Sequence, residues 1–255
     1  MERNKRNPKK QDQRKPKAES YPVRLNKYIA NAGICSRRNA DELIKTGQVM
    51  VNEVVVTEMG FQVNRGDKVK YNNKLIRPEK FVYVLLNKPK DFITTMEDTH
   101  DRRTVMELVE KACQERIFPV GRLDRNTTGL LLFTNDGTLT EKLTHPSYQI
   151  KKIYQVDLNK PISKQDFEKL LEPIQLEDGA VVLDEVVLLS ADKKTIGLEI
   201  HVGKNRIVRR IFEHLGYEVV KLDRTMYGPL TKKDLPRGKW RFLSPKELIV
   251  LKNLS

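Results

Sequence analysis

Apolar residues near the start of the chain recur at the spacing of two short helices. The first helix is predicted by apolar residues three and four positions apart before the stop signal Gly33, namely Leu25, Tyr28, Ile29 and Ala32. In the second, Ser36 can serve as the N-cap and Gly47 closes the helix, while the inward positions are Ala40, Leu43 and Ile44. The pattern predicts a pair of helices joined by a turn.

Short strands are predicted after the helices. Val49 and Val51, residues 54–56, and Val69 with Tyr71 have strand character, and residues 65–67 form a turn. A small α+β module therefore ends near Lys80.

Longer apolar segments then alternate with turns and a few helices. Buried strands are expected at residues 81–86, 129–133 and 151–158, a helix at 105–113, and a hairpin from 181–189 and 195–202. This order lacks a regular βαβ alternation, so the fold class is α+β, with a mixed, largely antiparallel sheet and flanking helices. We expect a disordered basic tail at 1–21, the small module at 22–80 and a larger domain at 81–255.

The charge is concentrated in the first part of the chain. The 255 residues include 48 Lys and Arg against 34 Asp and Glu, a net charge of +14, and residues 1–80 account for +10 of that net charge. Such localisation favours a polyanion, and nucleic acid above all, because each cation that neutralises a phosphate releases counterions. An anionic membrane would call for an amphipathic helix beside the charge, and the tail contains none.

The remaining composition narrows the class of protein. No apolar stretch approaches the roughly 20 residues of a membrane span, and no apolar segment of a secretory signal follows the N-terminus, so we expect a soluble, cytoplasmic protein. The two cysteines, Cys35 and Cys113, form no CxxC and no metal-ligand spacing with the four histidines. Disulfides and a structural zinc are not expected.

Residues 121–129 are a polar loop that leads into the most apolar predicted strand. Asp124 lies there between Arg122 and Arg125, and flanking cations favour the charged form of a carboxylate. An ionised, partly desolvated Asp can act as a nucleophile. The alternative is an Asx turn that happens to be basic.

Two further segments combine polar groups with regular structure. Residues 203–212 begin a predicted helix that continues to Leu215, and its polar face carries Arg206, Arg209, Arg210 and Glu213. Three guanidinium groups near the start of a helix are unfavourable unless an anion lies close to them. Glu213, an RNA phosphate or Asp124 could be that anion, and the alternative is a polar face that is simply solvated. In residues 151–156 strand alternation places Lys152 and Tyr154 on one face, where Tyr154 either packs or stacks on a flipped-out base.

The first module resembles an S4 domain. The resemblance covers residues 22 to about 72 and rests on residues 24–28, 36–38 and 47–52. It implies binding to structured RNA through Arg24, Lys27, Arg37, Arg38 and Lys45. Arg37 and Arg38 lie in the first turn of a helix, where cations are mildly unfavourable unless a phosphate is bound, and two solvated arginines are the alternative.

The ordered motifs at residues 121–137, 143–147, 152–156 and 203–210 resemble the RsuA/RluB family of ribosomal RNA pseudouridine synthases. The resemblance implies isomerisation of uridine without a metal or other cofactor. Asp124 would be the nucleophile, at C6 of the base or C1′ of the ribose, Tyr154 would stack on the uracil and take the proton from C5, and Arg209 would pair with Asp124. The residues implied to grip RNA phosphates are Lys88, Arg122, Lys152 and Arg206.

Two residues depart from the family pattern without touching the implied chemistry. Ile207 stands where the family often has glutamine, and Asp91 where glycine is common. The sequence of residues 127–133 resembles the large-subunit branch of the family more than the small-subunit branch, which favours 23S over 16S rRNA. Two compact domains without an apolar patch suggest a monomer. The alternatives are a non-catalytic S4-type rRNA-binding protein and a glycoside hydrolase, which would need a second carboxylate.

Overall fold

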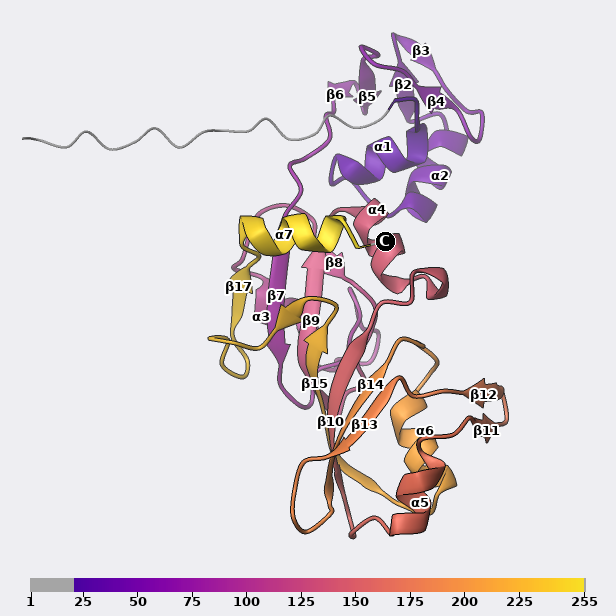
Figure 1. Ribbon diagram of the computed structural model, residues 1–255. Coiled ribbons are helices and arrows are strands. Elements are labelled where there is room, and N and C mark those ends of the chain that lie inside the picture. The colour runs from indigo at the N-terminus through magenta and orange to yellow at the C-terminus, as the bar shows by residue number, and fades with distance from the viewer. Residues whose placement is uncertain (1–20, 255) are drawn as a thin grey trace, which may run out of the picture. The chain divides into compact units, whose positions relative to one another are not determined.

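The computed structural model describes residues 21–254 of the chain (Figure 1). It divides into two compact units, one ending at Pro78 and the other beginning at Glu79. Apart from Tyr21, the tail expected to be disordered lies outside the described residues.

The first unit packs two helices with small sheets. Helix α1 (Leu25–Asn31) and helix α2 (Arg37–Lys45) form as predicted, and the Ser36 side chain accepts a hydrogen bond from the Asn39 backbone N–H as the N-cap of α2. A four-stranded sheet has the order β3 (Val54–Val55), β2 (Val49–Val51), β5 (Val69–Tyr71), β6 (Lys74–Leu75), and β1 (Val23–Arg24) pairs with β4 (Gln62–Val63). The short strands β1, β4 and β6 were not predicted, because two residues carry too little periodicity to reveal them.

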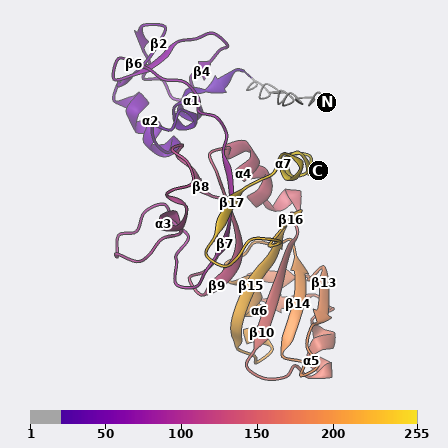
Figure 2. The same cartoon turned by 90° about the vertical axis from the view of Figure 1, so that its left-hand side faces the viewer.

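The second unit is built on a nine-stranded sheet (Figures 1 and 2). Along its main path the strands are β13 (Glu185–Leu188), β14 (Thr195–Ile200), β10 (Lys152–Leu158), β15 (Val219–Tyr227), β9 (Thr127–Thr134), β7 (Tyr83–Lys88) and β17 (Trp240–Phe242). Strand β16 (Leu230–Thr231) pairs with β15, and β8 (Phe118–Pro119) pairs with β9. Only the β9–β15 pair is parallel among these strands, which confirms the predicted mixed, largely antiparallel sheet.

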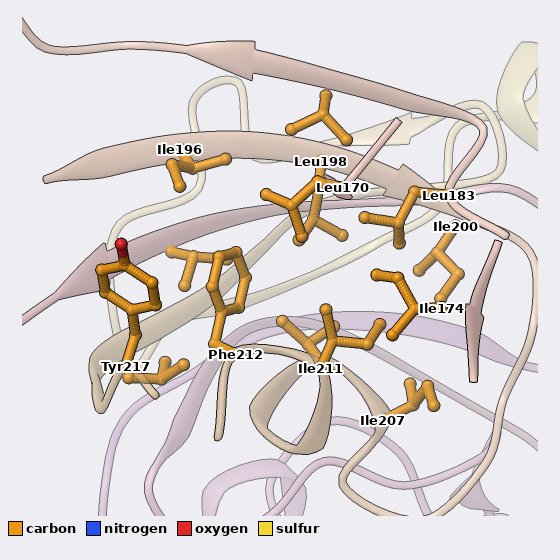
Figure 3. Packing of buried hydrophobic residues seen from close by; sticks show 14 of the residues in the cluster. Leu170, Ile174, Leu183, Ile196, Leu198, Ile200, Ile207, Ile211, Phe212 and Tyr217 are labelled. Carbon is orange, nitrogen blue, oxygen red and sulfur yellow. The ribbon is translucent and has the colours of Figure 1, made fainter. Parts of the chain in front are cut away.

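Helices and a small hairpin complete the second unit. The helices are α3 (Val105–Val109), α4 (Gly137–Thr144), α5 (Lys164–Lys169), α6 (Ile207–His214) and α7 (Pro245–Lys252), with a 3₁₀ turn at Pro146–Tyr148. Strands β11 (Ile174–Leu176) and β12 (Gly179–Val181) form a separate hairpin. Figure 3 shows the apolar face of α6 packed against the sheet, where Ile211 and Phe212 meet Ile196 and Leu198 in one buried cluster. Within residues 21–254 no helix combines the length and apolar character that crossing a bilayer requires.

Two predicted elements end elsewhere than expected. The helix predicted at 105–113 stops at Val109, because the Ala112 N–H turns back to the Val109 carbonyl. The strand predicted to end at residue 86 continues to Lys88, which pairs with Gly129 of β9.

The junction of β9 with β15 depends on a glycine. Gly129 has a φ of +107°, and a Cβ atom added there would overlap the backbone of Arg224. On the other side of β15, the pairing with β10 shifts by one residue between Ile153 and Tyr154. This bulge at Thr225 lets the Thr225 hydroxyl donate to the Ile153 carbonyl at 3.2 Å.

Candidate active site

Five of the polar residues singled out above converge on one cavity of about 650 Å³ in the second unit. Its walls come from the loop around Asp124, the segment that precedes α6, and the adjacent strands β10 and β15. Asp124, Lys152, Tyr154 and Arg206 all line it, and Arg122 lies exposed among the lining residues. Residues 93–102, which the sequence did not mark as functional, form a further wall.

The loop that carries Asp124 is tied down on both sides of the carboxylate. The Thr127 N–H donates to the Asp124 carbonyl at 3.0 Å. The Thr94 hydroxyl donates to the Leu123 carbonyl at 2.7 Å and accepts from the Leu123 N–H at 3.2 Å. The Asp124 side chain is about 36% exposed, so it is held on a fixed loop yet open to the cavity.

Lys88 lies beneath this loop rather than on the surface, and this corrects the expectation that it grips a phosphate. The residue has 0% exposure. Its ammonium donates to the carbonyls of Pro89, Asp124, Arg125 and Thr127 at 2.8–3.2 Å. Burial lowers the pKa of Lys88 to about 8, although the charge of Asp124 opposes that shift. Lys88 therefore fixes the backbone of the Asp124 loop and cannot reach RNA.

Arg206 and Arg209, which were expected on one polar face of α6, have different surroundings in the structure. Arg206 is the N-cap of α6 in the left-handed region, with a φ of 45°, and its Nη1 lies 3.9 Å from the Asp124 carboxylate. Its Nη2 also donates to Glu213 at 3.2 Å. Arg209 is only 9% exposed, and its Nη1 donates to the Val219 carbonyl at 2.7 Å.

Arg209 thus does not pair directly with Asp124, and it does not share the polar face of α6 as predicted. Its guanidinium lies on the buried side of the helix, where Nε has no hydrogen-bond partner. Burial and the charge of Arg206 lower the pKa of Arg209, whereas the charge of Asp124 raises it. Arg209 is therefore a buried cation whose field reaches Asp124, while Arg206 makes the nearer ion pair.

Sequence reasoning missed the carboxylate that positions the segment before α6. Asp178, in the turn of the β11–β12 hairpin, receives Arg210 Nη2 at 2.5 Å and Nη1 at 3.0 Å. Lys204 donates to the Asp178 carbonyl at 2.7 Å. Arg210 holds the pKa of Asp178 at about 2. Asp178 therefore contacts both ends of the segment between Lys204 and Arg210. This segment contains Arg206, which has a left-handed backbone and lies near Asp124.

We expect Asp178→Ala to slow turnover about tenfold while leaving thermal stability nearly unchanged. Exposed ion pairs contribute little to stability, but displacement of a positioned side chain by about 1 Å is costly to catalysis. Single-turnover rates and thermal unfolding of the variant measure both effects. Asp192→Ala, which removes another exposed turn carboxylate, is the control, and an equal rate loss there would refute a specific role for Asp178.

Tyr154 and Lys152 emerge from β10 on the face that lines the cavity. Tyr154 lies opposite Arg224 of β15, and Lys152 lies opposite Tyr227. The Lys152 ammonium donates to the carbonyls of Ile150 at 2.9 Å and His201 at 2.7 Å. Burial, together with the charge of Arg224, lowers the pKa of Lys152 to about 8. Lys152 is thus partly engaged by the protein but still borders the cavity.

The cations predicted in the first unit lie on or beside its helices. Arg24 precedes α1 and Lys27 is within it. Arg37 and Arg38 occupy the exposed first turn of α2, and Lys45 occupies its last turn.

The cavity brings together groups that suit an anionic substrate. A carboxylate and cations share it, and a phenol stands on the same wall. In the part of the chain that the structure describes, no group of three or more His, Cys, Asp or Glu residues is placed to hold a metal ion. The cations of this cavity and the basic helical unit of the same chain favour an enzyme that acts on nucleic acid.

Comparison with known proteins identifies the family. The RNA pseudouridylate synthase family matches residues 82–214, and the S4 domain matches residues 23–69. The chain is 44% identical over 236 residues to the ribosomal large subunit pseudouridine synthase B of Bacillus subtilis, covering 91% of this chain and 96% of that protein. It is 39% identical to the dual-specificity RNA pseudouridine synthase RluF of Escherichia coli, covering 90% and 78%.

A crystal structure of a pseudouridylate synthase matches with a TM-score of 0.64 at 28% identity, covering 90% of this chain and 99% of that one. The chain therefore belongs to the RNA pseudouridine synthase family, and it carries an N-terminal S4 domain.

Proposed function

We propose that this protein isomerises uridine to pseudouridine in ribosomal RNA, with 23S rRNA as the substrate. The observation that carries the proposal is the cavity in which Asp124, Tyr154 and Arg206 meet. Family membership supports the reaction, and the B. subtilis relative named for the large ribosomal subunit supports 23S rRNA. Because ribosomal RNA is made and modified in the cytoplasm of bacteria such as these relatives, we place the enzyme there.

In this proposal Asp124 attacks the target nucleotide at C6 of the base or C1′ of the ribose. The N1–C1′ bond breaks, the uracil turns within the cavity, and C5 bonds to C1′. The bond between Asp124 and the nucleotide breaks and restores the carboxylate, and N1 gains a proton that matches the one lost from C5. Tyr154 stacks on the base and accepts the proton that leaves C5. Arg206, Lys152 and Arg122 border the cavity, where they position the RNA backbone rather than read its sequence.

Arg209 has an indirect role in the proposed mechanism. Its buried guanidinium supplies positive potential toward Asp124 without contacting it. Because uridine and pseudouridine have the same composition and oxidation level, the isomerisation itself calls for no cofactor.

Tritium release from 5-³H-uridine in 23S and 16S rRNA transcripts tests the reaction and the choice of RNA together. The hydrogen at C5 of uracil is lost when C5 becomes bonded to ribose, so turnover releases tritium to water. We expect release from 23S rRNA only. Release from 16S rRNA only would overturn the substrate assignment, and tight binding without release from either would favour a non-catalytic RNA-binding protein.

A hydrolytic reaction at the same glycosidic bond would need a second carboxyl group as general acid. Asp98 lines the cavity, but Arg102 contacts its carboxylate at 2.6 Å, and the hydrogen bonds from Arg102 hold the pKa of Asp98 well below its usual range. A general acid requires the opposite shift. This geometry argues against Asp98 as that acid, and Glu97 is the other acidic residue beside it in the lining.

The S4 unit is proposed to hold the RNA through Arg24, Lys27, Arg37, Arg38 and Lys45. We expect Arg37→Ala combined with Arg38→Ala to weaken binding and to reduce the slope of log K against log salt concentration by about 2, since two phosphate contacts are lost. Filter binding of a 23S fragment at several salt concentrations measures both quantities. Arg65→Ala with Lys74→Ala removes the same charge from other exposed positions, and an equal change there would contradict a specific helical contact.

We also propose that the enzyme acts as a monomer, since Asp124, Tyr154 and Arg206 all come from one chain and the proposed reaction calls for no residue of a second copy. Light scattering of the purified protein should give a mass near 29.6 kDa, and a dimer mass would contradict this.

A further inference from the structure

Arg224 is a buried guanidinium at the catalytic cavity that sequence reasoning did not single out. The residue is 3% exposed, and it lines the same cavity as Asp124. Its Nε donates to the Leu130 carbonyl at 2.8 Å, and its guanidinium lies 4.6 Å from the centre of the Tyr227 ring. Its Nη2 is buried and has no hydrogen-bond partner.

The bulge in β15 brings Arg224 to this position. In a regular strand, residues three apart point to opposite faces of the sheet. The extra residue, Thr225, shifts the register so that Arg224 lies opposite Tyr154 while Tyr227 lies opposite Lys152. Arg224, Tyr227, Tyr154 and Lys152 thus share the face that lines the cavity.

The electrostatics of this face call for an anionic or strongly polar acceptor. No carboxylate lies within ion-pair distance of Arg224 among residues 21–254, and a buried donor without a partner is costly. Lys152 adds a second cation on the same wall, and the charge of Arg224 contributes to the lowered pKa of Lys152. An oxygen atom of a ligand in the cavity would satisfy Nη2 and offset this charge.

We propose that Arg224 is a further catalytic residue, whose Nη2–H donates to a carbonyl oxygen of the uracil ring and stabilises the negative charge that develops there. If Asp124 adds to C6, the electrons of the C5–C6 double bond move toward O4. If Asp124 attacks C1′, the electrons of the N1–C1′ bond pass to the uracil and spread over O2 and O4. Arg224 forms no covalent bond in either case, and its donor is already in place as the charge appears.

This inference rests on the proposed function, and its test separates the two. Arg224→Gln and Arg224→Lys are compared with wild type by single-turnover tritium release from 23S rRNA transcripts, by filter binding and by thermal unfolding. We expect the Gln variant to lose about 10²–10³-fold in rate, with a Kd within about twofold of wild type, and the Lys variant to retain an intermediate rate. If wild type releases no tritium, the proposed function itself fails.

Two outcomes would overturn the role of Arg224 while the proposed function stands. An unchanged single-turnover rate would show that its donor is not used, and a weaker Kd with an unchanged rate would assign it to phosphate binding. Should the Gln variant fail to fold, the Lys variant provides the test. If Arg224 were only a structural cation, the lysine would replace it and the folded variant would keep the wild-type rate.

Chemical rescue distinguishes a catalytic role of Arg224 from a structural one. Adding guanidinium ion at non-denaturing concentration to Arg224→Ala should raise its single-turnover rate at least about tenfold. The control is Arg241→Ala, which removes a guanidinium paired with Glu247 outside the cavity and should show no such rise. A folded Arg224→Ala protein that guanidinium does not rescue, with the Lys variant as slow as the Gln variant, would refute the proposal.

Discussion

Asp124→Asn is expected to lower turnover by at least about 10⁴-fold while RNA binding stays within about twofold of wild type. The amide is nearly isosteric with the carboxylate, so the loop held by Lys88 and Thr94 keeps its shape. An amide has neither the charge nor the nucleophilicity of a carboxylate, so the covalent step is lost. Tritium release under single-turnover conditions and filter binding on the same 23S transcript measure the two effects.

Asp91→Asn provides the matched control for that experiment. Asp91 is an exposed carboxylate whose side chain lies 3.4 Å from Arg125, beside the same loop. We expect this variant to keep most of its activity. Substantial turnover by Asp124→Asn would show that the nucleophile assignment is wrong, and an equal loss in Asp91→Asn would attribute the effect to loop charge instead.

Gly129→Ala is expected to destabilise the second unit by about 3 kcal/mol or more, which for a domain of this size lowers its Tm by about 6–12 °C. The added Cβ would overlap the Arg224 backbone, and φ at this position is +107°. Strands β9 and β15 would have to separate, and they carry the Asp124 loop and Arg224. Thermal unfolding followed by circular dichroism measures the change.

Gly203→Ala is the control for Gly129→Ala. A Cβ at Gly203 meets no atom within 4 Å, so stability should change by less than about 0.5 kcal/mol. Equal destabilisation of both variants would mean that the close approach of β9 and β15 is not what requires glycine at residue 129.

Local sequence patterns predicted much of the fold because they act over a few residues. The spacing of Leu25, Tyr28 and Ile29 and the N-cap Ser36 placed α1 and α2 where the structure has them. The strictly alternating residues of β14 likewise identified a half-buried strand, whose inward residues Ile196 and Leu198 join the core.

Site residues were harder to assign when their role depends on partners far along the chain. Lys88 was interpreted as a phosphate ligand, but its ammonium is satisfied by carbonyls at 124–127, almost 40 residues away. Arg209 was placed on a polar helical face, but the Val219 carbonyl holds it on the buried side. Asp178 gave no local signal at all, since only the β11–β12 hairpin brings it to Arg210.

By itself, the sequence determined the fold class, the basic RNA-binding character of the first unit and the motifs that identify the family, because periodicity, charge and short motifs are local properties. The tertiary structure decided which cation faces Asp124, why Lys88 is buried, and that Arg224 borders the cavity. The position of Arg224 depends on the parallel approach of β15 to β9 and on the bulge at Thr225. Strand register turns a side chain toward one face or the other, and no local pattern in residues 219–227 specifies it.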